Sequence, residues 1–106
     1  MSIFHLFRKK STFEDGINKA FSTPNFVLLD VRTAQEYSMG HIPGSVNIPL
    51  DQIQSINMPK EKNIFVYCHS GARSATACRY LTASGYKAIN IGGISGYRGL
   101  IEKGGR

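Results

Sequence analysis

One stretch constrains the fold more than any other: residues 64–74, which read IFVYCHSGARS. The four apolar or aromatic residues 64–67 are typical of a short buried strand. The run ends at Cys68, and Gly71 permits a tight backbone turn shortly after it. The apolar residues that follow recur at the spacing of one helix face: Ala75, Ala77, Cys78 and Leu81. The pattern therefore predicts a strand that ends at Cys68 and a helix that begins about one turn later.

A cysteine at such a junction has the surroundings of a reactive thiolate. Successive N–H groups before a helix can curl into a nest that favours an anion. A helix N-terminus and a nearby cation, here Arg73, both lower the pKa of a cysteine, and the thiolate is the nucleophile. Cys68 is therefore the candidate nucleophile. The candidate anion-binding residues follow it: His69, Ser70, Gly71, Ala72, Arg73 and Ser74.

Three motifs resemble the rhodanese family. Residues 68–74 are similar to its active-site loop, and residues 30–37 and 40–49 are similar to its upstream motif. Residues 92–94 are similar to a glycine pair that opens the last helix in that family. The motifs occur in the family's order and cover most of the chain after about Thr12. One departure is Tyr97, because the family usually has a tryptophan shortly after the glycine pair and this chain has none.

The resemblance implies a rhodanese-like three-layer α/β fold with a mainly parallel central sheet. Strand and helix patterns alternate along the chain, which independently predicts a parallel sheet with helices on both faces. We expect an N-terminal arm at 1–11 and a single rhodanese domain at 12–106. Capping boxes at 11–14 and 33–36 predict two helix starts. The last strand and last helix are expected at 87–91 and 94–101.

Asp30 and Arg32 follow another buried strand, so they should lie at the same sheet edge as Cys68. Asp30 is either a structural acceptor of backbone N–H groups or part of the site, and we favour the structural role, holding the Cys68 loop in shape. Arg32 either forms a salt bridge, with Glu36 or another acid, or contacts an anion. Both are kept as supporting residues.

The other histidines and the second cysteine do not indicate further chemistry. A histidine beside a nucleophilic cysteine suggests a base, but adjacent loop residues usually point apart, so His69 is interpreted as a wall of the pocket with a minor electrostatic role. His5, His41 and the cysteines have no ligand spacing that fits zinc, so no metal is expected. Cys78 is interpreted as a small core residue on the helix face, with a resolving thiol as the alternative.

The net charge of +6 is carried by residues 60–106, the half that contains Cys68. A basic surface concentrates anionic substrates, although a generic solubilising excess explains it equally well. Nucleic acid is not an expected partner, because no basic run is interleaved with aromatic residues. The apolar runs are too short to span a membrane, and residues 1–7 precede their charges, the reverse of a signal peptide. We therefore expect a cytoplasmic protein without a membrane partner.

The resemblance to rhodaneses implies a sulfurtransferase that needs no cofactor, because the cysteine itself would carry the sulfur. Cys68 would take sulfur from a small anionic donor such as thiosulfate, form a persulfide, and pass the sulfur to cyanide or a thiol. Relay of the sulfur to a partner protein is an open alternative. Less favoured alternatives are a cysteine-dependent phosphatase or arsenate reductase and an inactive binding module of the same fold. Four residues separate Cys68 from Arg73, whereas cysteine phosphatases have five, which favours sulfur over phosphate.

Overall fold

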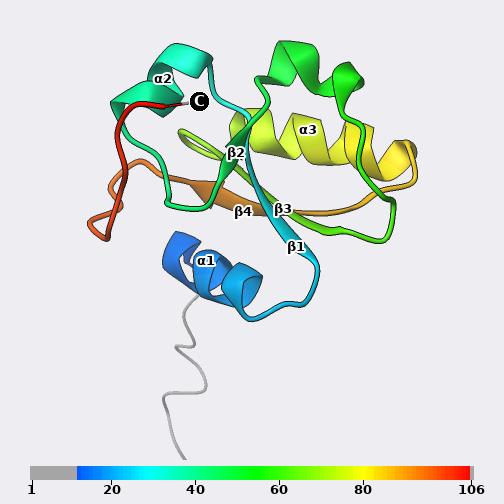
Figure 1. The fold of residues 1–106 in the computed structure, drawn as a ribbon, viewed down its shortest axis with the longest axis horizontal. Helices are drawn as coiled ribbons and strands as arrows, with labels where there is room; N and C mark the ends of the chain where they lie inside the picture. The colour runs from blue at the N-terminus through cyan, green and yellow to red at the C-terminus, as the bar shows by residue number, and fades with distance from the viewer. Residues whose placement is uncertain (1–11, 106) are drawn as a thin grey trace, which may run out of the picture.

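A computed structural model describes residues 12–105 and shows one four-stranded parallel sheet in the order β2-β1-β3-β4. The strands are β1 (Phe26–Asp30), β2 (Val46–Asn47), β3 (Asn63–Cys68) and β4 (Lys87–Gly93). The helices are α1 (Phe13–Phe21), α2 (Ala34–Met39), α3 (Ala72–Ala83) and the 3-10 helix η2 (Leu50–Ser55). Helix α1 covers one face of the sheet, and α2 and α3 lie on the other (Figure 1). The three-layer α/β prediction is confirmed.

Alternate residues of the central strands enter two separate cores. Phe65 and Tyr67 of β3 pack in the core beneath α1. Val66 and Cys68 of the same strand pack in the core beneath α3. Successive side chains of a strand point to opposite faces, so the strand register directs Cys68 towards α3.

Side-chain caps fix the starts of α1 and α2. The second predicted capping box is confirmed: Thr33 accepts a hydrogen bond from the backbone of Glu36, and the Glu36 carboxylate accepts one from the backbone of Thr33. The first prediction was one residue early. Thr12, not Ser11, is the N-cap of α1, because the carboxylate of Asp15 reaches back to the Thr12 N–H at 3.1 Å.

The prediction of a helix at 94–101 is wrong, since the structure has a turn, a bend and irregular backbone there. The backbone N–H groups of Ile94 and Ser95 donate to the carbonyls of Cys68 and His69, both at 2.9 Å. Gly96 has φ +81°, a left-handed conformation that ends helical propagation. The chain then runs back to α2 (Figure 1), where Glu102 pairs with the backbone of His41.

The predicted N-terminal arm, 1–11, and His5 within it lie outside the described residues. Within residues 12–105, no helix is both long enough and apolar enough to cross a membrane.

Candidate functional site

The thiol of Cys68 lies where buried strand β3 ends and the backbone turns into α3. The residue is 1% exposed, since the strand is central and the following loop folds over it. Gly71 is the N-cap of α3 with φ +103°, in the left-handed region that glycine adopts readily. The predicted junction of strand, tight loop and helix is therefore present, and it needs only two residues between Cys68 and the glycine turn.

Hydrogen-bond donors surround the sulfur. The N–H of Gly71 lies 3.0 Å from the Cys68 Sγ atom, and the Ser74 hydroxyl oxygen lies 3.5 Å from it. Burial raises the pKa of the thiol, but hydrogen bonds from the Ser74 hydroxyl and from the backbone N–H groups of Ser74, Gly71 and Ser70 outweigh it. The pKa of Cys68 therefore lies below its ordinary value, as nucleophilic chemistry requires.

The end of β4 and the two residues after it pack against the backbone of this loop. Besides the two hydrogen bonds from Ile94 and Ser95, Gly93 packs directly against the loop backbone. A Cβ atom placed on Gly93 would lie 2.2 Å from the His69 carbonyl oxygen. The second glycine of the predicted pair is therefore needed for close approach, and not for opening a helix.

Asn90, also on β4, was not identified from the sequence. Its side-chain oxygen accepts the Ser74 hydroxyl at 2.7 Å and the Gly92 N–H at 2.9 Å. Its side-chain nitrogen donates to the Gly71 carbonyl at 3.1 Å. No local motif marks this residue, because its partners lie 16 and 19 positions away and meet it only through the pairing of β3 with β4.

Arg73 forms an ion pair with Glu36. Its two terminal nitrogens bond both oxygens of Glu36 at 2.7 and 3.0 Å, and about a third of each side chain is exposed. This pairing lowers the pKa of Glu36 to about 2. The positive charge of Arg73 still acts on Cys68 electrostatically, and Cys68 in turn raises the pKa of Arg73, after the larger effect of Glu36.

Asp30 and Arg32 bond to each other. The Asp30 carboxylate accepts the backbone N–H of Arg32 at 2.9 Å and its guanidinium at 2.7 Å. The guanidinium also donates to the Gly40 carbonyl. Asp30 therefore accepts a backbone N–H as expected, but the N–H belongs to its own turn rather than to the Cys68 loop. Arg32 pairs with this acid, and Glu36 pairs with Arg73.

The remaining candidates lie apart from the sulfur chemistry. His69 is exposed in the loop, and His41 is buried and stacked on Tyr37 at 3.6 Å between ring centroids. Cys78 is half-buried against the α3 core, and burial raises the pKa of its thiol to about 11. Both cysteines are free thiols. Within residues 12–105, no group of three or more His, Cys, Asp or Glu side chains is placed to hold a metal.

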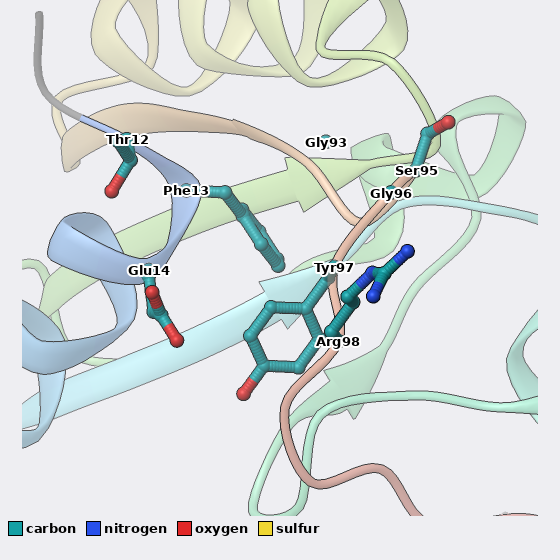
Figure 2. Close-up of a pocket in the computed structure, with 8 residues that line it drawn as sticks. All are labelled: Thr12, Phe13, Glu14, Gly93, Ser95, Gly96, Tyr97 and Arg98. Carbon is teal, nitrogen blue, oxygen red and sulfur yellow. The ribbon is translucent and has the colours of Figure 1, made fainter.

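Two hollows flank the loop without including Cys68. One, of about 340 Å³, lies between the start of α1 and the segment after β4, and Figure 2 shows the Phe13 ring pointing toward Tyr97 in its wall. These rings pack edge to face with centroids 5.4 Å apart, so Tyr97 ties the segment after β4 to the start of α1. The other, of about 350 Å³, adjoins Arg73. The remaining residues that line it are Val31, Thr33, Pro49, Leu50 and Asp51.

Comparisons with known proteins agree with this geometry. Residues 14–100 match the Rhodanese-like domain family. A sulfurtransferase of Allochromatium vinosum is 40% identical over 76 residues, which cover 68% of this chain and 71% of that protein. The putative sulfur carrier protein YrkF of Bacillus subtilis is 37% identical over 80% of this chain, which spans 46% of its length. A crystal structure of a rhodanese-like domain protein from Staphylococcus aureus superposes with a TM-score of 0.73, at 34% identity over 87% of this chain and 94% of that one. These relatives support sulfur transfer as the general activity.

Proposed function

The chain belongs to the rhodanese-like domain family, and from this premise we propose that it carries sulfane sulfur as a persulfide on Cys68. The thiolate attacks the outer sulfur of thiosulfate or a similar donor. The sulfur–sulfur bond of the donor breaks, and sulfite leaves with its electron pair. Cyanide or a thiolate then attacks the outer sulfur of the persulfide, and the Cys68 thiolate is released with the electron pair of the second bond.

The observation that carries this proposal is the donor set around one sulfur. The Gly71 N–H at 3.0 Å comes from the N-cap of a twelve-residue helix, and the Ser74 hydroxyl at 3.5 Å comes from its first turn. Such a set stabilises a thiolate before the reaction and the negative outer sulfur after it. The remaining loop residues, His69, Ser70 and Ala72, supply the backbone of the same turn, and Ser70 and Ala72 are exposed to an incoming donor.

Arg73 is proposed to draw the anionic donor towards the loop. Its guanidinium lies at the start of α3, and its charge acts on Cys68. A protein acceptor is also proposed, because the sulfur carrier protein named above shares 37% of its residues with this chain over the matched region. The hollow beside Arg73 leaves room for an acceptor at the same end of the sheet.

Intact mass spectrometry tests the persulfide directly. The protein is treated with thiosulfate, desalted, and measured before and after addition of cyanide. We expect a gain of one sulfur atom that cyanide removes as thiocyanate. Cys68→Ser should gain none, because a hydroxyl is barely ionised at neutral pH and forms no persulfide.

Cys78→Ala is the matched control. It removes the other thiol, whose pKa burial raises to about 11, and should still gain and lose one sulfur. A sulfur that persists on Cys68→Ser, or that disappears in Cys78→Ala, would contradict the assignment of the carrier to Cys68.

A further inference from the structure

The hydroxyl of Ser74 lies near three acceptors. Ser74 is fully buried on the first turn of α3. Its oxygen lies 2.7 Å from the side-chain oxygen of Asn90, 3.4 Å from the Gly92 carbonyl oxygen and 3.5 Å from the Cys68 sulfur. A serine hydroxyl has one proton to donate, so the short hydrogen bond to Asn90 weakens the two longer ones.

The orientation of the Asn90 amide is fixed by its other partners. Its nitrogen donates to the Gly71 carbonyl at 3.1 Å, so its oxygen must face the opposite way. That oxygen also accepts the Gly92 N–H at 2.9 Å. The Gly71 carbonyl requires the amide nitrogen of Asn90 on its side, and the Gly92 N–H requires the amide oxygen on the other. That oxygen faces Ser74, so the Ser74 hydroxyl is the donor in the 2.7 Å contact.

We propose that Asn90 is a positioning residue that competes with Cys68 for the single hydroxyl proton of Ser74, and so limits how strongly the thiolate is hydrogen-bonded. The 2.7 Å contact has the length of a good hydroxyl hydrogen bond, whereas the 3.5 Å contact to sulfur is a weaker one. Asn90 therefore shares the Ser74 hydroxyl with the sulfur, so the hydrogen bond to Cys68 is present but weakened.

The consequence concerns nucleophilicity. A thiolate becomes less nucleophilic as its pKa falls, and each strong hydrogen bond to it lowers that pKa. By competing for the Ser74 proton, Asn90 keeps the resting thiolate more nucleophilic than a Ser74 hydrogen bond made to the sulfur alone would allow. This role rests on the proposed function, because only a nucleophilic Cys68 makes use of it.

Other charges near Cys68 are unchanged by a substitution at Asn90. Arg73 on α3 acts on the sulfur and is paired with Glu36. Asp30 at the end of β1 is paired with Arg32. His69 follows Cys68 in the loop.

The test is the pH dependence of Cys68 alkylation by iodoacetamide, measured in a Cys78→Ala background so that one thiol reacts. We expect Asn90→Ala to move the midpoint of the rate profile to lower pH by about half a unit or more, since the freed hydroxyl can turn to the sulfur. The plateau rate at high pH should fall by about twofold, because the thiolate is less nucleophilic.

A purely structural role for Asn90 predicts the opposite. If Asn90 only held the loop in place, its loss would weaken the hydrogen bonds from the loop N–H groups to the sulfur. The midpoint of the alkylation profile would then move to higher pH. Asn90→Ala in a Ser74→Ala background should show no downward shift, since the competing hydroxyl is absent. Asn90→Asp should show none either, because a carboxylate oxygen still accepts the Ser74 proton.

Ile89→Ala is the matched control. It lies on the same strand, is 49% exposed, and should leave the profile unchanged. An unchanged or raised midpoint in Asn90→Ala, with the fold intact by circular dichroism, would overturn the proposal. Alkylation requires no sulfur transfer, so a protein that forms no persulfide with thiosulfate would contradict the proposed function and leave this test valid.

Discussion

The two cysteines of the chain show how position determines the state of a thiol. Burial alone acts on Cys78, and it raises the pKa of that thiol to about 11. Cys68 is more deeply covered, yet its pKa lies below the ordinary value, because Ser74 and the loop N–H groups donate to the sulfur. At the scale of one residue, reactivity therefore follows from the hydrogen-bond donors and not from exposure.

Arg73→Ala should raise the KM for thiosulfate several-fold while the fold is retained. The variant removes a cation that acts on Cys68, and the loss should be smaller at high salt because the attraction is screened. Steady-state kinetics with thiosulfate at low and high ionic strength measures both effects.

Glu36→Gln separates the charge of Arg73 from its structural tie. This variant weakens the ion pair at 2.7 Å but leaves the guanidinium in place and makes the site more positive. We expect its KM to be unchanged or lower. An equal rise in KM for both variants would show that Arg73 serves as a tie between α2 and α3 and not as an attractor of the donor.

At the scale of elements, the end of β4 and the Cys68 loop form one unit. Gly93→Ala should slow persulfide formation by about tenfold or more and lower the melting temperature. The new methyl group would lie 2.2 Å from the His69 carbonyl oxygen, so the loop must move, and such overpacking costs about 1–3 kcal/mol. Thermal unfolding and the rate of sulfur uptake by mass spectrometry measure the two effects.

Gly96→Ala is the matched control for that prediction. Its φ of +81° strains any other residue, but nothing lies within 4 Å of an added Cβ. It should lose stability and retain sulfur uptake. If both alanine variants lose sulfur uptake equally, close packing of Gly93 is not what shapes the loop.

Local patterns in the sequence were enough to predict most elements. The Thr33 capping box, the strand ending at Cys68 and the helix after Gly71 depend on neighbouring residues, and all three are present. The helix expected after the glycine pair is absent because its first N–H groups bond to the Cys68 loop, which is a tertiary contact.

The polar partners of the site were also harder to predict, because they are tertiary contacts between separate elements. Asn90 and Ser74 belong to different elements, and so do Arg73 and Glu36, which lie 37 positions apart. No spacing rule indicates which of two arginines a given acid will bind. The sequence therefore predicted the strand, the loop and the candidate nucleophile Cys68, while the side chains that orient them required the fold.

At the scale of the whole molecule, Glu36 joins the starts of two helices, α2 and α3. Its carboxylate accepts the Thr33 N–H at the start of α2 and binds Arg73 at the start of α3, above the edge of the sheet where Cys68 lies. Acid should therefore weaken the contact between α2 and α3 by protonating a single side chain.

The direction of the pH effect follows from the pKa of Glu36, which is lowered from 4.5 to about 2 in the folded protein. A lowered carboxyl pKa stabilises the folded state above the unfolded value, and that stability is lost as pH falls from about 4.5 towards 2. Solvent screens the pair because a third of each side chain is exposed, so we expect its contribution to be about 1 kcal/mol or less.

Urea unfolding at pH 6, 4.5 and 3 tests this coupling. Glu36→Gln should have a lower free energy of unfolding than the unsubstituted protein at pH 6, and this difference should narrow towards pH 3. Arg73→Ala should show a gap that narrows over the same range, because it removes the main cause of the shift. A gap of constant size in both variants would mean that this ion pair does not couple the fold to pH.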